Sequence, residues 1–148
     1  MEYKHTQWGF IPIFVLPMVA VAVVPLVAGD EETTTLVIVA TVAFMIALLA
    51  VVLVFSRLEV TVSGGRIVAA FGFGRPRTVI ELGDVTAVRQ ERNTWIQGWG
   101  TRKISRGWMY NVWGLDAVEI ELSSGKVFRI GTNDPENLLA VIALQIVR

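Results

Sequence analysis

Hydrophobic positions follow two different patterns along the chain, and the first occupies the N-terminal third. Residues 8–28 carry no charged side chain, and residues 33–55 carry only threonines as polar residues. At a rise of about 1.5 Å per residue, each block forms a helix of about 30 Å, which is the thickness of a bilayer's hydrocarbon core. Only residues 29–32 separate the blocks, so the sequence predicts an antiparallel two-helix transmembrane hairpin within residues 1–56.

A cleaved signal peptide is the alternative interpretation of the first block, because Val27 and Gly29 are small enough to flank a cleavage site. The block is longer than the usual apolar core of a signal peptide, which favours the hairpin. Basic residues flank the outer ends of the two blocks, at Lys4 and from Arg57 onward, whereas the connecting residues 29–32 are acidic. By the positive-inside rule, both termini are expected in the cytoplasm.

The second pattern begins at residue 57 and has the period of two that is typical of strands. Leu58, Val60 and Val62 alternate with polar residues before Gly64-Gly65 turns the chain. Similar short segments follow at 66–73, 78–82, 85–90, 109–112, 118–122 and 126–130. A helix is then expected from Asp134-Pro135-Glu136 to about residue 147. Residues 57–148 are therefore predicted to form an all-β half-open barrel of about seven antiparallel strands with a C-terminal capping helix.

Composition agrees with a membrane protein and limits the chemistry. Hydrophobic residues make up 53% of the 148 residues and charged residues only 18%. Thirteen basic and thirteen acidic residues balance, so no overall electrostatic field attracts nucleic acid. No nucleic-acid partner is expected. The chain has no Cys and one His, His5, which removes thiolate nucleophiles, disulfides and metal sites built from several histidines.

Two carboxylates in one predicted strand are the nearest approach to a catalytic pair. Glu119 and Glu121 alternate with Val118, Ile120 and Leu122. This alternation is more typical of a solvated strand face than of general acid–base chemistry. Ser123 and Ser124 follow in a turn, with no histidine nearby in the sequence to act as a base. The sequence therefore predicts no enzyme, no catalytic residue, no metal and no cofactor.

The order of short motifs in residues 57–148 resembles one known family. Gly98-Trp99-Gly100, Gly114 to Val118, Gly125-Lys126 and Ile130 to Glu136 occur in an order similar to that of the membrane-anchored bacterial pleckstrin-homology-like (bPH) domains. The resemblance implies a seven-stranded sandwich-barrel with a C-terminal helix beside transmembrane helices, in a bacterial plasma membrane. It implies no catalytic residues, and most members of that family have no assigned biochemical role.

Tryptophans and basic residues interleave between Arg89 and Trp113. Rings of this type offer contact area and guanidinium groups offer paired hydrogen bonds, so the window suits a protein interface or a lipid headgroup layer. The alternative is that the tryptophans fill the barrel and the basic side chains are solvated. The candidate interaction surface is Trp95, Trp99, Arg102, Lys103, Arg106 and Trp108.

These observations lead to one functional prediction and one alternative. The prediction is a non-catalytic membrane-anchored interaction or scaffold module that contacts a protein partner or a second copy of itself. The alternative is a receptor that binds a lipid or small ligand in the barrel or in the window rich in Trp and Arg.

Overall fold

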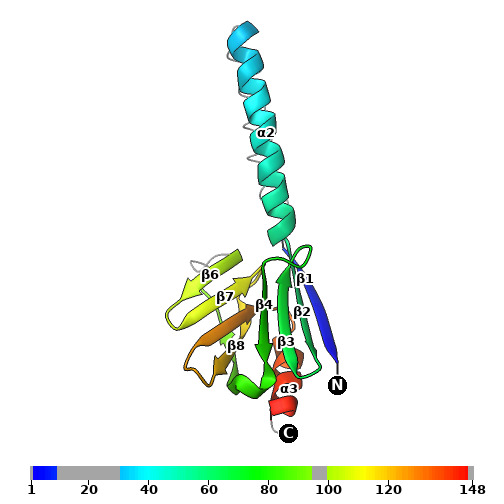
Figure 1. Cartoon of the computed structure of the whole chain (residues 1–148), viewed down its shortest axis with the longest axis vertical. Helices are drawn as coiled ribbons and strands as arrows, with labels where there is room; N and C mark the ends of the chain where they lie inside the picture. Colours follow the sequence, from blue (N-terminus) through cyan, green and yellow to red (C-terminus); the bar gives the residue numbers. More distant parts are fainter. Residues whose placement is uncertain (1, 10–30, 95–99, 147–148) are drawn as a thin grey trace. The chain divides into compact units, whose positions relative to one another are not determined.

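The computed structural model describes residues 2–9, 31–94 and 100–146, and it describes the backbone but not the side chains of residues 31–34. The chain divides into two compact units (Figure 1). Unit 1 contains Met1–Gly9 and Phe55–Arg148, and unit 2 contains Phe10–Val54. Residues 3–8 are therefore part of the same folded body as the C-terminal domain, although about 45 residues separate them in the sequence.

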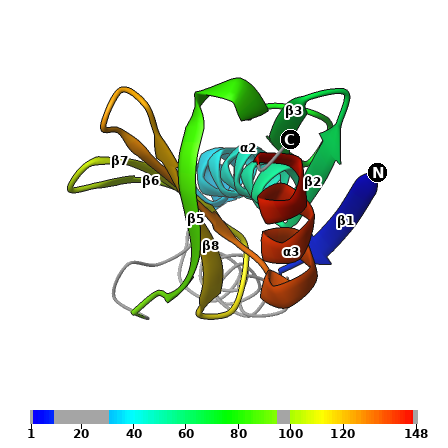
Figure 2. The same cartoon turned by 90° about the horizontal axis from the view of Figure 1, so that it is seen from below.

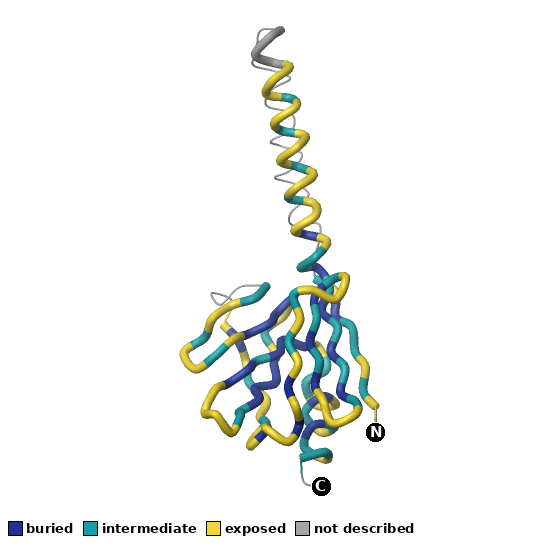
Figure 3. Tube along the Cα trace, in the orientation of Figure 1, coloured by how far each residue is buried: buried dark blue, intermediate teal, exposed yellow. Residues whose placement is uncertain are grey.

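Helix α2 (Glu31–Phe55) is the regular element that the structure describes in unit 2. Its segment Thr35–Phe55 is long and apolar enough to cross a membrane, by length and composition alone. Most of its described side chains are exposed (Figure 3), including Leu36 at 72% and Ile46 at 64%. A helix with apolar residues on all sides is typical of a protein interior or a membrane. Within the part of the chain that the structure describes, most of that surface is not covered by protein.

The first sheet of unit 1 has four antiparallel strands in chain order: β1 (Tyr3–Trp8), β2 (Arg57–Ser63), β3 (Arg66–Phe71) and β4 (Arg77–Glu81). Alternate residues of β2 and β3 face the core, because successive side chains of a strand point to opposite faces. In β2, Leu58, Val60 and Val62 are at most 3% exposed. A short 3₁₀ turn, η1 (Leu82–Asp84), leads from β4 to the second sheet.

The second sheet has five strands and a different connectivity. Its strands are β5 (Val85–Arg92), β6 (Gly100–Ile104), β7 (Gly107–Asn111), β8 (Asp116–Leu122) and β9 (Val127–Gly131), in the spatial order β5-β8-β9-β7-β6. Strands β7 and β9 are parallel, and the other neighbours are antiparallel. A Cβ atom added to Gly107 would lie 1.7 Å from the carbonyl oxygen of Val127, so only glycine allows this close parallel pairing.

The two sheets enclose one core, and α3 (Pro135–Ile146) closes it. Viewed from below in Figure 2, α3 lies between the edges of both sheets. Its Leu138 and Ile142 are fully buried. The rings of Phe71, Tyr110 and Phe128 contact one another in a row between the sheets, in tilted and edge-to-face pairs with centroids 4.9 and 5.0 Å apart. Aromatic side chains therefore occupy space in which a receptor barrel would hold its ligand.

The predicted fold class was wrong about the N-terminal region. In place of an N-terminal two-helix transmembrane hairpin, the described residues contain one long apolar helix, α2, and the segment Tyr3–Trp8 is a strand. Trp8, the first residue of the predicted span 8–28, ends this strand, and residues 10–28 lie outside the described part of the chain. The possible signal-peptide cleavage site at Val27 and Gly29 lies outside it too.

The predicted barrel was also wrong in strand number and pairing. Nine described strands form two sheets, where about seven antiparallel strands were expected, and one pair is parallel. Two strands were missed, β1 and β6. Strand β6 lies between the predicted segments 85–90 and 109–112, where no regular element was expected. It forms a tight hairpin with β7, from Gly100 paired with Asn111 to Ile104 paired with Gly107, although its own residues lack the apolar alternation that is typical of a strand.

Strand β1 is held to unit 1 by polar contacts as well as by pairing with β2. The Tyr3 hydroxyl donates a hydrogen bond to Asp134 Oδ2 at 3.1 Å, and His5 Nε2 lies 2.6 Å from Asn133 Oδ1. Burial, together with the charge of Asp134 and this hydrogen bond, raises the pKa of Tyr3. Because Asp134 directly precedes α3, these contacts join the first strand to the last helix.

Candidate functional site

Cross-strand register places charged residues from separate parts of the chain in one row on the outer face of the second sheet. Arg89 on β5 is paired with Glu119 on β8, and Glu119 is paired with Arg129 on β9. The row continues through Met109 on β7 to Arg102 on β6. Directly opposed side chains in neighbouring strands are close enough to interact, so this register brings the two arginines to one carboxylate.

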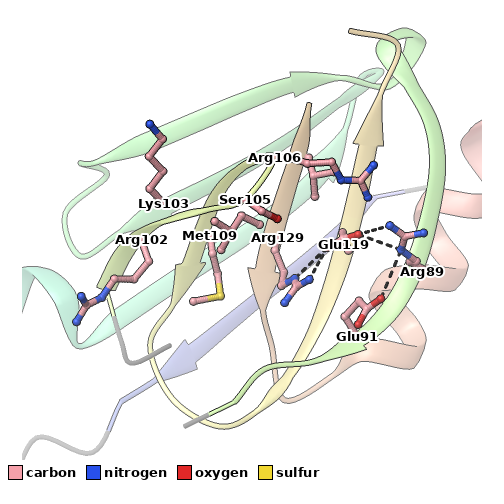
Figure 4. A pocket seen from close by; sticks show the side chains of 11 residues that line it. Arg89, Glu91, Arg102, Lys103, Ser105, Arg106, Met109, Glu119 and Arg129 are labelled. Atoms are coloured by element: carbon pink, nitrogen blue, oxygen red, sulfur yellow. Dashed lines mark hydrogen bonds and ion pairs between the residues drawn. The ribbon is translucent and has the colours of Figure 1, made fainter. Parts of the chain in front are cut away.

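Glu119 is the centre of this row and is almost completely buried, with its side chain 5% exposed. Its Oε1 accepts hydrogen bonds from Nε of Arg89, at 2.9 Å, and from Nη2 of the same residue. Its Oε2 accepts hydrogen bonds from Nε of Arg129, at 3.1 Å, and from Nη2 of Arg129. Both carboxylate oxygens are therefore saturated by guanidinium donors, and Figure 4 shows the two arginines approaching Glu119 from either side.

Opposing effects act on the pKa of Glu119. Burial disfavours the charged carboxylate, but the hydrogen bonds and positive charges of Arg129 and Arg89 outweigh burial and lower the pKa below its ordinary value. The hydrogen bond to Glu119 in turn raises the pKa of Arg89. The predicted solvated position of Glu119 is therefore wrong. Glu119 is buried because its register brings it opposite Arg89 and Arg129, and the alternation within β8 alone does not reveal that register.

A hollow of about 640 Å³ lies over this row. We call it the charged hollow, and it is lined by Arg89, Glu91, Arg102, Lys103, Ile104, Ser105, Arg106, Met109, Glu119, Val127 and Arg129. Five of these side chains are cations and two are carboxylates, so the lining has a net positive charge. Gly107 adds no side chain to the row that passes through Val127 and Ile104, and this missing side chain deepens the hollow.

The cations of the charged hollow differ in how fully they are paired. Arg89 has three carboxylates within 4.0 Å, and Arg106 lies 3.5 Å from Glu121. Arg102 and Lys103, on the outermost strand β6, are exposed and have no acidic side chain within salt-bridge distance in the described part of the chain. In Figure 4 they project from β6 in opposite directions. They are therefore the cations most available to an outside anion.

The structure brings together three of the six residues predicted as an interaction surface. Arg102, Lys103 and Arg106 line the charged hollow. Trp108, which is 51% exposed, lies on β7 between Gly107 and Met109 but is not among the lining residues. Trp95 and Trp99 lie outside the described residues.

Sequence reasoning missed the partly buried half of the hollow, which Arg89, Glu119 and Arg129 form. Arg89 was counted in the Trp and Arg window, but Arg129 was treated only as a strand residue. The available signal was the presence of one arginine in each strand that flanks the Glu119 strand. Using that signal required the order β5-β8-β9, which places the three residues side by side.

Comparison of the sequence with protein-family models finds no match, and comparison with curated proteins finds none either. The resemblance to the bPH family therefore stays a prediction.

Proposed function

We propose that the protein is a non-catalytic interaction module, attached to the cytoplasmic face of a membrane by its apolar segment, that binds an acidic segment of a partner protein in the charged hollow. The observation that carries the proposal is the charge imbalance of the hollow. Glu119 neutralises part of the charge of Arg89 and Arg129, whereas Arg102 and Lys103 on the outer strand have no acidic partner in the described chain.

The spread of the cations favours an extended acidic chain over a small anion. Neighbouring strands lie about 4.8 Å apart, so the row from Arg89 on β5 to Arg102 on β6 extends about 19 Å across the sheet. A single phosphate group is too small to contact both ends of that row. A peptide with several carboxylates can contact the free cations of β6 and the exposed part of Arg89 together.

Attachment to a membrane is supported by the exposed apolar surface of α2 and by the organisation of unit 1. Residues 3–8 and 57–146 belong to one folded body and must therefore lie on the same side of a membrane. Beyond residue 56, twelve Lys and Arg face nine Asp and Glu, a net charge of about +3. This excess favours the cytoplasmic side, in line with the positive-inside rule.

A non-catalytic role is supported by the chemistry of the hollow. Its central carboxylate is held ionised between two arginines, so it is a poor proton donor or acceptor near neutral pH. The single histidine, His5, lies on β1 against Asn133 and is not among the lining residues.

Binding of a fluorescent poly-glutamate peptide to the full chain in zwitterionic nanodiscs tests this proposal. Removing two exposed charges with Arg102→Gln and Lys103→Gln should weaken binding about tenfold, because each surface ion pair contributes about 0.5–1 kcal/mol. The matched control is Arg66→Gln with Lys126→Gln, which removes the same charge outside the hollow and should leave affinity within about twofold.

Three results would overturn the assignment of an acidic protein segment. The first is that the peptide does not bind at low salt. The second is that both double variants weaken peptide binding equally. The third is that inorganic phosphate displaces the peptide completely at a concentration equal to that of the peptide, which would indicate a small-anion site. The membrane part is tested separately by alkaline carbonate extraction, in which an attached protein stays with the membrane pellet.

A further inference from the structure

The two connections between unit 1 and unit 2 lie at one end of the first sheet. Unit 1 ends its first segment at Gly9 and resumes at Phe55. The Gly9 amide donates a hydrogen bond to the carbonyl oxygen of Ser56 at 2.6 Å, and Trp8 is paired with Arg57 in the sheet register. The chain therefore leaves unit 1 and returns to it at the same place.

Exposed aromatic side chains gather at that end of unit 1. Trp8 is 62% exposed, and Phe73, in the turn between β3 and β4, is 88% exposed. This turn lies beside the chain exit because the Gly72 amide donates to the carbonyl oxygen of Arg57 at 2.8 Å. Trp113 is also exposed, and its carbonyl oxygen accepts a hydrogen bond from Nε2 of Gln7 at 2.6 Å. We call Trp8, Phe73 and Trp113 the aromatic rim.

The backbone around Phe73 presents its ring to the outside. Gly72 and Gly74 both have positive φ angles, 46° and 93°, which glycine adopts without steric cost. The turn therefore places a large apolar side chain at its tip, between two residues without side chains. A single exposed apolar residue is common, but Phe73 together with Trp8 and Trp113 forms an exposed aromatic cluster, which points to an apolar surface that contacts this end of unit 1.

Cations surround the aromatic rim. Arg75 and Arg77 follow Phe73, are exposed, and have no acidic side chain within salt-bridge distance among residues 2–9, 31–94 and 100–146. The Arg57 guanidinium carbon lies 5.6 Å from the ring centroid of Trp8. Tryptophan and phenylalanine at the boundary of the acyl chains, with arginines at the phosphate level, are the combination found at membrane interfaces.

The opposite end of unit 1 has a different character. It is formed by the turn at Gly64-Gly65, by η1 and by the turn after β8, which are connected by hydrogen bonds from Leu82 to Gly65 and from Ser123 to Asp84. Its exposed residues are Gly64, Gly65, Gly83, Asp84, Ser123, Ser124, Gly125 and Lys126. Trp8, Phe73 and Trp113, with Arg75 and Arg77, thus lie at the end where the chain passes into the apolar segment, whereas the exposed Trp108 and Arg102 belong to the β6–β7 hairpin.

We propose that the aromatic rim contacts the membrane interface, with Phe73 inserted at the level where headgroups meet acyl chains and Arg75 and Arg77 against lipid phosphates. This inference rests on the proposed membrane attachment, because an apolar segment held in the bilayer keeps Gly9 and Phe55 next to the lipid surface. The contact gives unit 1 a second attachment besides the covalent connections and limits its rotation about them.

The absence of cysteine from the sequence allows a direct test with single labels. Phe73→Cys and Ser124→Cys would each carry an environment-sensitive fluorophore in the full chain, in nanodiscs that contain lipids with a quencher at headgroup depth. The strands between the two ends are about 20 Å long, so quenching at position 73 should be about fivefold stronger than at position 124.

Arg75→Cys provides a second measurement in case the label replaces the natural contact of Phe73. It should also be quenched more strongly than position 124, and its emission should be less blue-shifted than that of position 73. Equal quenching at positions 73, 75 and 124 in protein that co-elutes with nanodiscs would overturn the rim contact alone. Protein that does not co-elute with nanodiscs would overturn the membrane attachment, and the rim inference with it.

Discussion

Glu59 in the first sheet and Glu119 in the second are each held between two cations, and the two sites differ in nearly every other respect. In the first sheet, Glu59 lies 3.1 Å from Nζ of Lys4 and 2.7 Å from Nη2 of Arg57, and its side chain is 28% exposed. In the second sheet, Glu119 is 5% exposed and receives both its cations from directly paired positions on the neighbouring strands. The first site lies on an open face, and the second forms the base of the charged hollow.

The pKa shifts show how burial changes the consequence of the same charge pattern. Both glutamates have a lowered pKa. For Glu59 the largest cause is the hydrogen bond from Lys4, whereas for Glu119 burial is the largest effect and acts in the opposite direction, so the arginines must overcome it. Loss of its partners leaves a buried carboxylate without compensation and lowers the free energy of unfolding, whereas a more exposed carboxylate can be solvated instead. Side-chain burial therefore determines which of the two sites constrains the fold.

The largest expected effect comes from disrupting the close strand pairing beneath the hollow. Gly107→Ala places a Cβ atom within 1.7 Å of a backbone oxygen on β9, and a backbone contact of that kind cannot be relieved by a rotamer change. We expect the free energy of unfolding to fall by about 3 kcal/mol or more, measured by thermal unfolding of the full chain in mild detergent.

Gly83→Ala is the matched control for this prediction, because no atom lies within 4 Å of its added Cβ and Gly83 has no positive φ angle. It should change stability by less than about 0.5 kcal/mol. Equal losses in both variants would show that the close β7–β9 pairing does not limit the second sheet.

The two sheets also differ in how far the sequence predicts them. Strands β2 and β3 follow directly from the alternation of Leu58, Val60 and Val62 and from the turn at Gly64-Gly65, since consecutive strands in a meander need only local signals. Strand β1 was missed because its partner, β2, lies about 50 residues away in the chain and its polar residues resemble the flank of a membrane span. Its place in the sheet depends on pairing and on the contact of Tyr3 with Asp134.

The candidate site could be predicted only in part for the same physical reason. Arg102, Lys103 and Arg106 are close together in sequence and were selected by local charge. Arg89, Glu119 and Arg129 come from three strands whose order is not the chain order, so their contact requires the complete topology. Local composition predicted the cations exposed at the edge of the hollow, and tertiary register determines its centre.

A smaller effect is expected from neutralising each glutamate. Glu119→Gln removes the charge that compensates Arg129, whose side chain is only 14% exposed, and should lower the free energy of unfolding by about 2–3 kcal/mol. Glu59→Gln should cost less than about 1 kcal/mol, because its partners can be solvated instead. Thermal unfolding of both variants under one condition makes the comparison. Equal costs would contradict the role assigned to burial.

The smallest expected effect is a difference in acid sensitivity. A carboxylate whose pKa is lower in the folded chain than in the unfolded chain contributes stability above its unfolded pKa, and that contribution is lost as the pH falls through the folded pKa. The ordinary glutamate pKa is 4.5, and that of Glu119 in the fold lies below it. The stability advantage of the wild-type protein over Glu119→Gln should therefore be constant above about pH 5 and should decrease at lower pH. Melting temperatures of the wild type and Glu119→Gln between neutral and acidic pH measure this change. The melting temperatures of the wild type and Glu59→Gln should approach each other less strongly at low pH, and added salt should remove that effect, because the Glu59 carboxylate is more exposed. A wild-type advantage that grows as the pH falls would show that folding raises the pKa of Glu119, contrary to the structure.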